Sequence, residues 1–475
     1  MVFMDRTLHW FRNDLRLSDN PALHAAVSAG TVLPVYVLDD ENSGVYQFGG
    51  ASRVWLHHSL TSLNDDLGGN LVVVSGDAAT LIPELVAAHS ITKVSWNRMY
   101  EPWAIKRDTK IKEHLKGQGI DVQSFNGALL WEPWDVKKQD GSPYRVFTPF
   151  YRKGCLNLQE PRKPLSKPKK INFIDAQPRA SIDDLNLLPK VNWHQSVAKH
   201  WKIGEQHAQK RLKSFLSSGI KQYKDGRNIP SKPYVSALSP YLRFGEISPN
   251  QVWYAARDLA HDQNVDHFCS ELGWREFSYN LLYHNPELPT KNLQSKFDKF
   301  RWDQNEDALK AWQKGNTGIP FVDAGMRELW QTGTMHNRVR MVVGSFLVKN
   351  LLLDWRHGER WFWDTLFDAD LANNSASWQW VAGCGADAAP YFRIFNPVTQ
   401  SKKFDPDGQY IRKYVPELKN IPNKYIHLPQ ELDDESLNSC GVKLGLDYPK
   451  QIVDLAITRD RALKAFKKLS SNNEI

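Results

Sequence analysis

The stretch 335–397 holds side chains that could bind and orient a large aromatic or charged ligand. Trp, Arg, Asp and Asn occur there at a density that a plain hydrophobic core does not require. We expect three helices to position them, over 336–349, over 360–371 and over 373–383. The third opens with an Asn-Asn-Ser run, which is good N-cap chemistry, and stops at a glycine.

The spacing within the first of these helices sorts its side chains by face. Asn337, Arg338 and Met341 lie at positions i, i+1 and i+4 and therefore share one side. Arg340 points well away from Met341 and can meet a different partner. The pattern predicts one helix face with a polar amide, a cation and a thioether.

Two tryptophans of the third helix, Trp378 and Trp380, are two residues apart and so face nearly opposite sides. One can pack into the interior while the other faces a cavity. Taken singly, each is more often a core residue than part of a site.

Another mixed face is expected on an earlier helix, at positions i, i+3, i+4 and i+7. It carries Glu271, Trp274, Arg275 and Ser278. A Glu beside a Trp on one helix face is more often a surface pair than a site, so this pattern alone decides nothing.

Asp368 and Asp370 stand two residues apart at the end of the second expected helix. Such spacing can belong to a divalent-metal motif, but no further acidic cluster supports one, so we predict no metal site. Arg340 and Asp368 have the chemistry for an ion pair, with an unrelated structural salt bridge as the alternative.

The totals describe a globular protein that is rich in tryptophan. A chain of 475 residues is too long to fold around a single hydrophobic core, so two or three domains are expected. The 18 Trp indicate stacking surfaces or redox chemistry, although most of them should simply be buried. A net charge of +8 fits a polyanionic partner.

Four cysteines without a C-x-x-C pattern indicate neither disulfides nor a zinc site. No stretch approaches transmembrane length, and the first residues lack the apolar core of a signal peptide. We therefore expect a cytoplasmic protein without membrane contact.

The first 126 residues alternate strand and helix signals, which is the rhythm of a doubly wound parallel sheet. Short apolar runs predict strands at 8–12, 32–38, 70–75, 93–97 and 121–125, and the helices between them at 52–67, 78–89 and 102–117. No G-x-G-x-x-G follows the first strand, so an ordinary NAD-binding unit is excluded.

The alternation stops near residue 131. The run 162–170, RKPLSKPKK, is Pro-rich and basic and reads as an exposed linker, with a DNA-binding arm as the less common alternative. From residue 201 onward helical periodicity dominates, and 450–475 predicts a short helix with a polar tail.

The motifs HNRVRM, DWRHGER, DADLANN, WQW and DAAPYFRIFNP resemble the C-terminal half of the photolyase/cryptochrome family. They look most like the bacterial class I photolyases, which repair cyclobutane pyrimidine dimers in DNA. The resemblance begins at WFRNDLR, residues 10–16, and runs nearly to the end of the chain. It implies an α/β antenna-binding domain over 1–130, an interdomain linker over 131–200 and a larger all-helical FAD-binding domain over 201–475.

The resemblance implies FAD as the cofactor, with its phosphates on the loop 235–239. This loop departs from the family's T-S-R-L-S because Val235 replaces Thr and Ala237 replaces Arg, which should weaken phosphate contact unless Lys232 or another cation substitutes. Residues implied to contact FAD are Tyr223, Val235, Ser236, Ala237, Leu238, Ser239, Phe268, Arg340, Asp368, Ala369, Asp370 and Asn374.

The same resemblance implies a cavity for a pyrimidine dimer extruded from DNA, a property expected from the class rather than from spacing. The dimer offers π faces to Trp274 and Trp380, and its carbonyls can accept hydrogen bonds from Asn337 and from a Glu271 kept neutral by burial. The implied substrate and DNA contacts are Arg227, Glu271, Trp274, Arg275, Ser278, Asn337, Arg338, Met341, Trp380 and Gln400.

Catalytic roles also follow from the resemblance. Asn374 matches the residue that faces flavin N5, where an amide offers both a donor and an acceptor, although N-capping is an alternative. Trp302, Trp355 and Trp378 match the chain that photoreduces the flavin. Glu271 is the fifth residue with an implied catalytic role.

A second, antenna chromophore is also implied. Glu101, which follows the fourth expected strand, matches a glutamate that hydrogen-bonds a folate such as methenyltetrahydrofolate. A deazaflavin or another flavin is the alternative chromophore. For Glu101 itself the alternative is an acid in the first turn of a helix that starts at Pro102.

The implied reaction is light-driven and makes the protein a carbon–carbon lyase, a deoxyribodipyrimidine photo-lyase. Excited reduced FAD donates an electron to the dimer, the ring splits and the electron returns. The partner is UV-damaged DNA, single- or double-stranded, and we expect a monomer.

Three other functions are alternatives to this one. A cryptochrome photoreceptor would share the fold and flavin, but relatives that signal often carry Asp or Cys in place of Asn374. A (6-4) photolyase usually carries a second His where Asn337 follows His336. A flavin-free DNA-binding module would leave Asp368 and Asp370 without a role.

Overall fold

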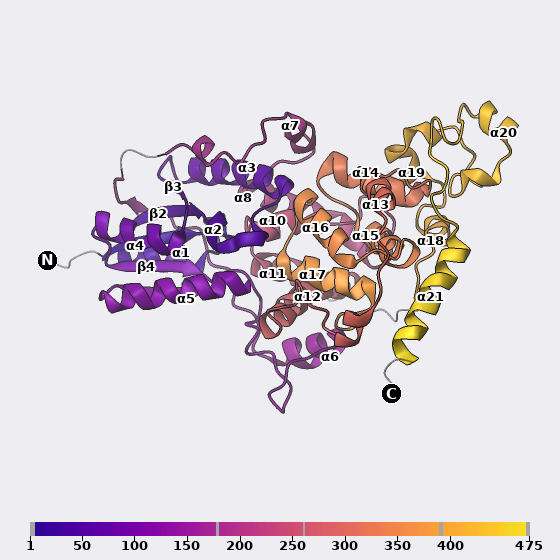
Figure 1. Ribbon diagram of the computed structural model, residues 1–475. Helices are drawn as coiled ribbons and strands as arrows, with labels where there is room; N and C mark the ends of the chain where they lie inside the picture. Colours follow the sequence, from indigo (N-terminus) through magenta and orange to yellow (C-terminus); the bar gives the residue numbers. More distant parts are fainter. Residues whose placement is uncertain (1–4, 177–179, 260–261, 389–392, 472–475) are drawn as a thin grey trace. The chain divides into compact units, whose positions relative to one another are not determined.

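The computed structural model describes residues 5–176, 180–259, 262–388 and 393–471 (Figure 1). The chain divides into two compact units that interleave along the sequence. Unit 1 contains Met1–Lys221, Ser236–Pro286 and Phe367–Ala372, and unit 2 contains Gln222–Val235, Glu287–Leu366 and Asn373–Ile475. The predicted domain boundaries stay a prediction, since no single cut of the chain separates these units.

Unit 1 is built around a parallel sheet with the strand order β3-β2-β1-β4-β5. The strands are β1 (Asp5–Phe11), β2 (Gly30–Leu38), β3 (Val72–Ser75), β4 (Lys93–Asn97) and β5 (Asp121–Phe125). A short β6 (Asn172–Phe173) adds to β2 at Thr31 and Val32. Strand order reverses between β1 and β4, so the predicted doubly wound architecture is confirmed.

Helices lie on both faces of this sheet (Figure 1). Helix α1 (Pro21–Ala29) contacts β1, β2 and β4 on one face, while α4 (Ala78–Ala88) and α5 (Pro102–Gly117) pack together on the other. Pro102 at the first helical position and Asp77 as the cap of α4 define these starts. Helix α3 (Gly50–Asp66) completes the N-terminal set.

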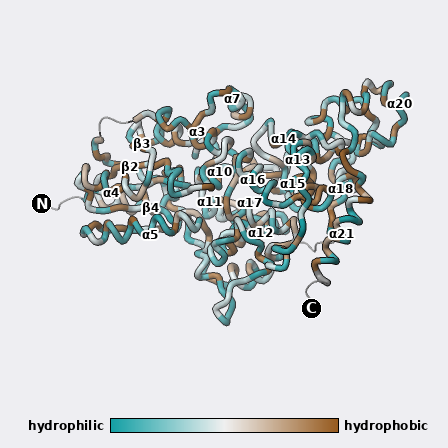
Figure 2. Tube along the Cα trace, viewed as in Figure 1, coloured by the Kyte–Doolittle hydropathy of each residue, from teal (hydrophilic) through white to brown (hydrophobic). Residues whose placement is uncertain are grey.

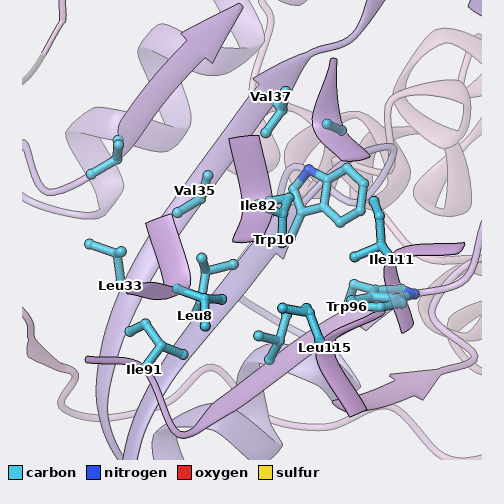
Figure 3. Packing of buried hydrophobic residues seen from close by; sticks show 14 of the residues in the cluster. Leu8, Trp10, Leu33, Val35, Val37, Ile82, Ile91, Trp96, Ile111 and Leu115 are labelled. Atoms are coloured by element: carbon cyan, nitrogen blue, oxygen red, sulfur yellow. The ribbon is translucent and has the colours of Figure 1, made fainter. Parts of the chain in front are cut away.

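The core under α4 and α5 collects every second residue of the strands, as period-2 strand geometry requires. Trp10 and Trp96 meet edge to face at 5.8 Å, with Ile82 of α4 and Ile111 of α5 against them (Figure 3). The outer side of α5 carries hydrophilic residues, visible as teal in Figure 2. One buried face and one solvated face therefore fix this helix on the sheet.

The basic run 162–170 is exposed over much of its length but is not loose. Asp19, fully buried, accepts hydrogen bonds from the Leu165 N–H at 2.8 Å and from the Ser248 hydroxyl at 2.5 Å, and it pairs with Arg162. Its own N–H donates to the Leu165 carbonyl at 2.9 Å. The predicted linker is thus tied to unit 1 by one aspartate.

Later segments of unit 1 are helical. They include α8 (Glu205–Ser217), α10 (Ser239–Arg243), α11 (Pro249–Arg257) and the long α12 (Gln263–His284). The α12 start is capped by Asp262, whose carboxylate accepts from the N–H groups of Asn264 and Val265.

Unit 2 is helical in its described residues. Its main helices are α13 (Glu306–Lys314), α14 (Pro320–Thr332), α15 (Asn337–Ser345), α16 (Trp355–Thr365), α17 (Leu371–Ala382, entered from unit 1), α18 (Pro397–Phe404), α19 (Gln409–Tyr414) and α21 (Leu455–Ser471). The helical C-terminal part of the predicted fold class is confirmed.

The predicted helix over 360–371 is wrong in its bounds. Helix α16 begins at Trp355 because the Asp354 carboxylate caps it, accepting from the Arg356 N–H at 3.0 Å. It ends at Thr365, since Leu366 is extended with φ −92° and ψ 135°. The acidic pair at 368 and 370 therefore lies in a non-helical segment.

The two neighbouring helices are closer to expectation. Helix α15 is α-helical to Ser345 and continues as a wider i to i+5 turn over Phe346–Asn350. Helix α17 starts at Leu371, two residues before the predicted start, and stops before Gly383, whose φ is +90°. Residues 389–392 of the DAAPYFRIFNP motif lie outside the described residues.

Two features are absent from the residues that the structure describes. No helix there is long and apolar enough to cross a membrane. The same part of the chain contains no group of three or more His, Cys, Asp or Glu arranged to hold a metal ion.

Candidate functional site

The candidate residues of unit 1 begin with the mixed face of α12. Trp274 is half-buried there, and its ring stacks on Phe147 with centroids 3.8 Å apart and planes 10° apart. Phe147 in turn lies parallel to Tyr151 at 5.6 Å. One face of the Trp274 indole is therefore covered by this aromatic stack, and Glu271 precedes Trp274 by one helical turn on the same helix.

The other two members of that face make contacts inside unit 1. Arg275 donates to the Ala128 carbonyl at 2.7 Å and lies 4.8 Å from the centroid of the Tyr279 ring. The Ser278 hydroxyl donates to the Trp274 carbonyl of the preceding turn at 3.1 Å. Contacts of Arg275 and Ser278 with DNA stay predictions, whereas their structural contacts are on α12 and its neighbours.

The segment 367–372 brings several predicted flavin contacts together. The Asp368 carboxylate accepts from the Ser239 hydroxyl at 2.6 Å, and the Ala369 carbonyl accepts from the Arg243 guanidinium at 2.5 Å. Asp370, which is buried, accepts from the Tyr279 hydroxyl. Ser239 and Asp368, which were predicted separately, thus form one polar pair.

The loop before α10 has a backbone suited to an anion. Ala237 has a left-handed φ of +51°, and Leu238 follows in the right-handed region at φ −92° and ψ −8°. Alternation of these two regions can direct successive N–H groups to one point and form an anion-binding nest. The Ser236 carbonyl is fixed by Arg211 at 2.8 Å. Replacement of the family's Arg by Ala237 therefore removes a cation but keeps a backbone that suits phosphate.

Another predicted flavin contact of unit 1, Phe268, is buried on α12 and packs 4.9 Å from Phe215. Its ring serves the interior of the unit. Contact with FAD stays a prediction.

Glu101 lies in the interior of unit 1. It occupies the position before Pro102 at the start of α5, but its side chain does not cap that helix and instead accepts from the Tyr100 N–H at 3.1 Å. Burial raises the pKa of Glu101, with Arg243 lowering it and Asp370 raising it further. Its contact with an antenna stays a prediction.

In unit 2 the expected face of α15 is present, but Arg338 is already oriented. Its guanidinium donates to the Asn228 side chain, lies 4.6 Å from the Phe404 ring centroid and approaches the Met341 sulfur at 3.3 Å. Asn337, at the first position of the helix, is exposed. These contacts preset a cation beside an exposed amide.

Other cations gather near the start of α15. His336 caps the helix, because its Nδ1 accepts from the Arg338 N–H at 3.2 Å. Burial lowers the pKa of His336 to about 4, with Arg227, Arg338 and Arg340 acting in the same direction. Arg340 donates to the Met335 carbonyl at 2.7 Å. The ring is therefore neutral near pH 7, and the arginines supply the positive charge.

The first segment of unit 2 contributes three more candidates. The Arg227 guanidinium lies 5.3 Å from the centroid of the buried Tyr223 ring. Val235 ends this segment at the unit boundary. Contacts of all three with FAD or DNA stay predictions.

Asn374 is held by a partner that the sequence did not indicate. Its amide nitrogen donates to the Glu359 main-chain carbonyl at 2.9 Å and to the Glu359 carboxylate at 3.1 Å. Burial raises the pKa of Glu359 to about 7, opposed by the hydrogen bond from Asn374. Because α17 begins at Leu371, Asn374 is not an N-cap. Its two amide hydrogens are used, so the amide presents its carbonyl oxygen.

The tryptophans of unit 2 occupy different surroundings. Trp378 is buried 5.0 Å from Phe362 and 6.2 Å from Trp312, whereas Trp380 is half-buried and lies 6.3 Å from Phe395. The expectation that Trp378 and Trp380 face different sides is confirmed. Gln400 sits half-buried on α18.

The other two predicted electron carriers, Trp355 and Trp302, each have contacts of their own in unit 2. The Trp355 indole N–H donates to the Asn292 side chain at 2.9 Å, and Trp302 lies 4.5 Å from Phe300. The spacing of the three-tryptophan chain therefore stays a prediction.

Several residues with evident chemistry were missed by sequence reasoning. Glu359 lies fifteen residues before Asn374, and Phe147 lies far from Trp274 in sequence, so no periodic pattern links them. Tyr279 lies one turn after Arg275 on α12, with the Arg275 guanidinium 4.8 Å from its ring centroid, and its hydroxyl donates to Asp370. Its place eight residues after Glu271 continues the i, i+3, i+4 and i+7 pattern, which is the signal that the sequence offered.

Comparisons with known proteins find relatives over nearly the whole chain. The sequence-family model described as DNA photolyase matches residues 7–169. The family model described as the FAD binding domain of DNA photolyase matches residues 268–468. A deoxyribodipyrimidine photo-lyase of Agrobacterium fabrum is 48% identical over 466 residues, covering 96% of each chain. Cryptochrome-2 of Arabidopsis thaliana is 38% identical, covering 98% of this chain and 79% of its own.

A solved photolyase structure is similar to this chain over nearly its whole length. The crystal structure of a bacterial class III photolyase from Agrobacterium tumefaciens has a TM-score of 0.95 and 46% identity, and covers 99% of both chains. The protein belongs to the photolyase/cryptochrome family and contains its FAD-binding domain. The family prediction is confirmed, and this solved relative is a class III photolyase, whereas the sequence motifs look most like class I.

Proposed function

We propose that this protein is a deoxyribodipyrimidine photo-lyase, which uses blue or near-UV light to split cyclobutane pyrimidine dimers in UV-damaged DNA. The observation that carries the proposal is the stacked Trp274. Phe147 covers one face of the indole, and its other face forms a rigid platform for a flat base. The relative at 48% identity bears the name of this activity.

Bound reduced FAD supplies the electron that opens the dimer, and the protein supplies binding and orientation. Ser239 and Asp368 form a polar pair, and the backbone around Ala237 suits a phosphate. Asn374, whose amide nitrogen donates to Glu359, would offer its carbonyl oxygen to a flavin N–H. The residues present therefore fit the cofactor.

The substrate is proposed to leave the DNA stack and to pack on Trp274. Glu271, one turn away, donates a hydrogen bond to a carbonyl of the dimer. In unit 2, Asn337 is exposed to make a similar bond, and Arg338, preset by Asn228, binds a flanking phosphate. Asn228 thus reduces the ordering that Arg338 must undergo on binding.

The role of Glu271 is tested by two substitutions. Glu271→Ala removes the donor and should lower light-driven dimer splitting about tenfold while FAD stays bound. Glu271→Gln keeps an N–H donor and should retain most of the activity. The two variants are compared by repair yield per photon and by flavin absorbance. Equal repair by wild type and Glu271→Ala would remove Glu271 from this role.

The Trp274 platform is tested by binding. Trp274→Ala should weaken binding of dimer-containing DNA about tenfold or more, because loss of base stacking costs roughly 1–3 kcal/mol. Trp330→Ala, at a tryptophan that is 64% exposed, is the matched control and should bind normally. Equal loss in both variants, or in neither, would contradict the platform.

A cryptochrome-type photoreceptor is the second candidate, favoured by the 38% identity to a plant cryptochrome. The two functions separate on one result: a photoreceptor binds FAD and responds to light but returns no intact pyrimidines from a dimer. An antenna chromophore, a folate in the first instance, stays a prediction that extraction and absorbance of the purified protein would test.

A further inference from the structure

Two buried tyrosines of unit 1 each donate their hydroxyl to a carboxylate. Tyr279 donates to Asp370, and Tyr100 donates to Glu132 at 2.8 Å. The two rings meet edge to face with centroids 5.9 Å apart. Two carboxylates and two phenols are therefore linked in the order Asp370, Tyr279, Tyr100 and Glu132, through two hydrogen bonds and one ring contact.

The pair leads outward to less buried aromatic rings. The ring of Tyr100 is 6.3 Å from that of the half-buried Trp134, which is 5.6 Å from Tyr283, also half-buried. Arg98 lies 5.6 Å from the Trp134 ring and binds Glu132. An oxidisable aromatic series thus runs from Asp370 to groups in contact with water.

Oxidation of a phenol is coupled to its proton. A neutral phenol that loses an electron becomes a strong acid, so the electron leaves easily only if a nearby base takes the proton. Burial raises the pKa of both Tyr279 and Tyr100, and their own carboxylate partners raise it further. Both tyrosines are therefore phenols at neutral pH, and each has its proton acceptor in place.

Arg275 strengthens this coupling. Its guanidinium lies 4.8 Å from the Tyr279 ring centroid and would oppose a positive charge on that ring. A neutral tyrosyl radical, formed as the proton passes to Asp370, avoids this charge. The surroundings of Tyr279 therefore favour joint loss of an electron and a proton over loss of an electron alone.

We propose that Tyr279 and Tyr100 form a second electron-donor route to the flavin, distinct from Trp302, Trp355 and Trp378. The route rests on the proposed function in one respect: it requires FAD beside Asp370. It gives the protein a way to reduce its cofactor in the light when the tryptophans are not available.

The steps balance. Light-excited oxidised flavin takes one electron from Tyr279, and the phenolic proton moves to Asp370. Tyr100 then gives an electron to the Tyr279 radical, Asp370 returns the proton to Tyr279, and the Tyr100 proton moves to Glu132. An external thiolate gives one electron to the Tyr100 radical, which recovers its proton from Glu132. The net change is one electron from thiolate to flavin, and two thiyl radicals combine to a disulfide.

The test uses the full-length FAD-bound protein with Trp378→Phe as the background, which blocks the first proposed indole. Flavin photoreduction is followed under blue light with an added thiol. We expect residual photoreduction that falls about fivefold or more when Tyr279→Phe or Tyr100→Phe is added. Tyr448→Phe is the matched control, because Tyr448 is also buried and donates to a carboxylate, Asp323, at 2.6 Å.

A second readout separates an electron carrier from a structural residue. Ring-deuterated tyrosine should narrow the radical signal trapped by freezing under illumination in the Trp378→Phe protein, and Tyr279→Phe should abolish that signal. The residual rate should also slow in D2O, since a proton moves with the electron.

The proposal is overturned if the Trp378→Phe protein shows no residual photoreduction. It is equally overturned if both tyrosine variants keep the rate of their parent, or if the control loses as much as they do. These measurements need no DNA, so their failure is distinct from failure to repair a dimer.

Discussion

Two fully buried tryptophans, Trp55 of unit 1 and Trp355 of unit 2, have different hydrogen-bond partners, and the difference decides which of them lies beside a group that can exchange a proton. The Trp55 indole N–H donates to the carboxyl group of Glu246 at 3.1 Å. In unit 2, Trp355 donates to the amide of Asn292 and Trp312 to a main-chain carbonyl. Amides and carbonyls accept hydrogen bonds but do not take a proton near neutral pH.

The contrast separates aromatic rings whose oxidation is independent of a nearby acid from rings whose oxidation is coupled to one. An indole beside an amide can lose an electron without a base, and its behaviour depends on packing. A phenol or indole beside a carboxylate is tied to the ionisation of that acid and therefore to pH. The surroundings of Trp55 should accordingly respond to pH, whereas Trp312, Trp355 and Trp378 of unit 2 should respond to changes in packing.

The largest expected effect is at Glu246, the partner of Trp55. Burial raises the pKa of Glu246 from its ordinary value of 4.5 to about 8. The folded state then holds a proton that the unfolded state has lost, so stability falls as pH rises from 4.5 through 8. Glu246→Gln keeps the acceptor and should remove this fall, worth roughly 3–5 kcal/mol by pH 9.

Denaturant midpoints at pH 5 and pH 9 measure this change. Asn292→Ala, which removes the amide partner of Trp355, is the comparison and should destabilise by the same amount at both pH values. A pH-independent difference between wild type and Glu246→Gln would contradict the assignment of the proton to Glu246.

The next effect is steric and belongs to unit 2. A Cβ added to Gly358 would lie 2.1 Å from the Trp378 ring, so Gly358→Ala must displace that indole. We expect about 1–3 kcal/mol of destabilisation, the usual range for overpacking. Gly117→Ala at the end of α5, where nothing lies within 4 Å, is the control and should be neutral or slightly stabilising. Thermal unfolding of both variants checks this, and normal stability of Gly358→Ala would show that Trp378 is not packed as described.

The smallest of these effects concerns electron supply. Trp378→Phe should lower flavin photoreduction about tenfold, equivalent to roughly 1.4 kcal/mol, with unchanged FAD content. The part of the rate lost should be insensitive to pH between 6 and 8, because the aromatic contacts of the Trp378 ring are with Phe362 and Trp312. Initial rates at several pH values measure it. A pH-dependent loss would break the distinction between Trp55 and the tryptophans of unit 2.

The sequence predicted unit 1 better than unit 2, for physical reasons. Strands 93–97 and 121–125 and helix 102–117 have the predicted bounds because β-branched runs and a proline at the first helical turn act locally. Helix α16 begins five residues before the predicted start at 360, because the Asp354 side chain of the DWRHGER motif caps it.

The site was predictable only as a set of residue types. The face of α12 and the spacing of Asp368 and Asp370 are visible in the sequence. The restraint of Asn374 by Glu359 and the stacking of Phe147 on Trp274 are contacts between separate elements. Their burial and partners decide which chemistry these residues can do, and no local pattern encodes that.

The most direct test of the proposed photo-lyase function is light-dependent repair. Photoreduced protein is mixed with an oligothymidine that contains cyclobutane dimers, illuminated in the blue, and compared with a dark control. Thymine absorbance should recover in the illuminated sample and not in the dark control. No recovery with FAD bound and reduced would contradict the photo-lyase function, and a (6-4) photoproduct would then be the next substrate to try.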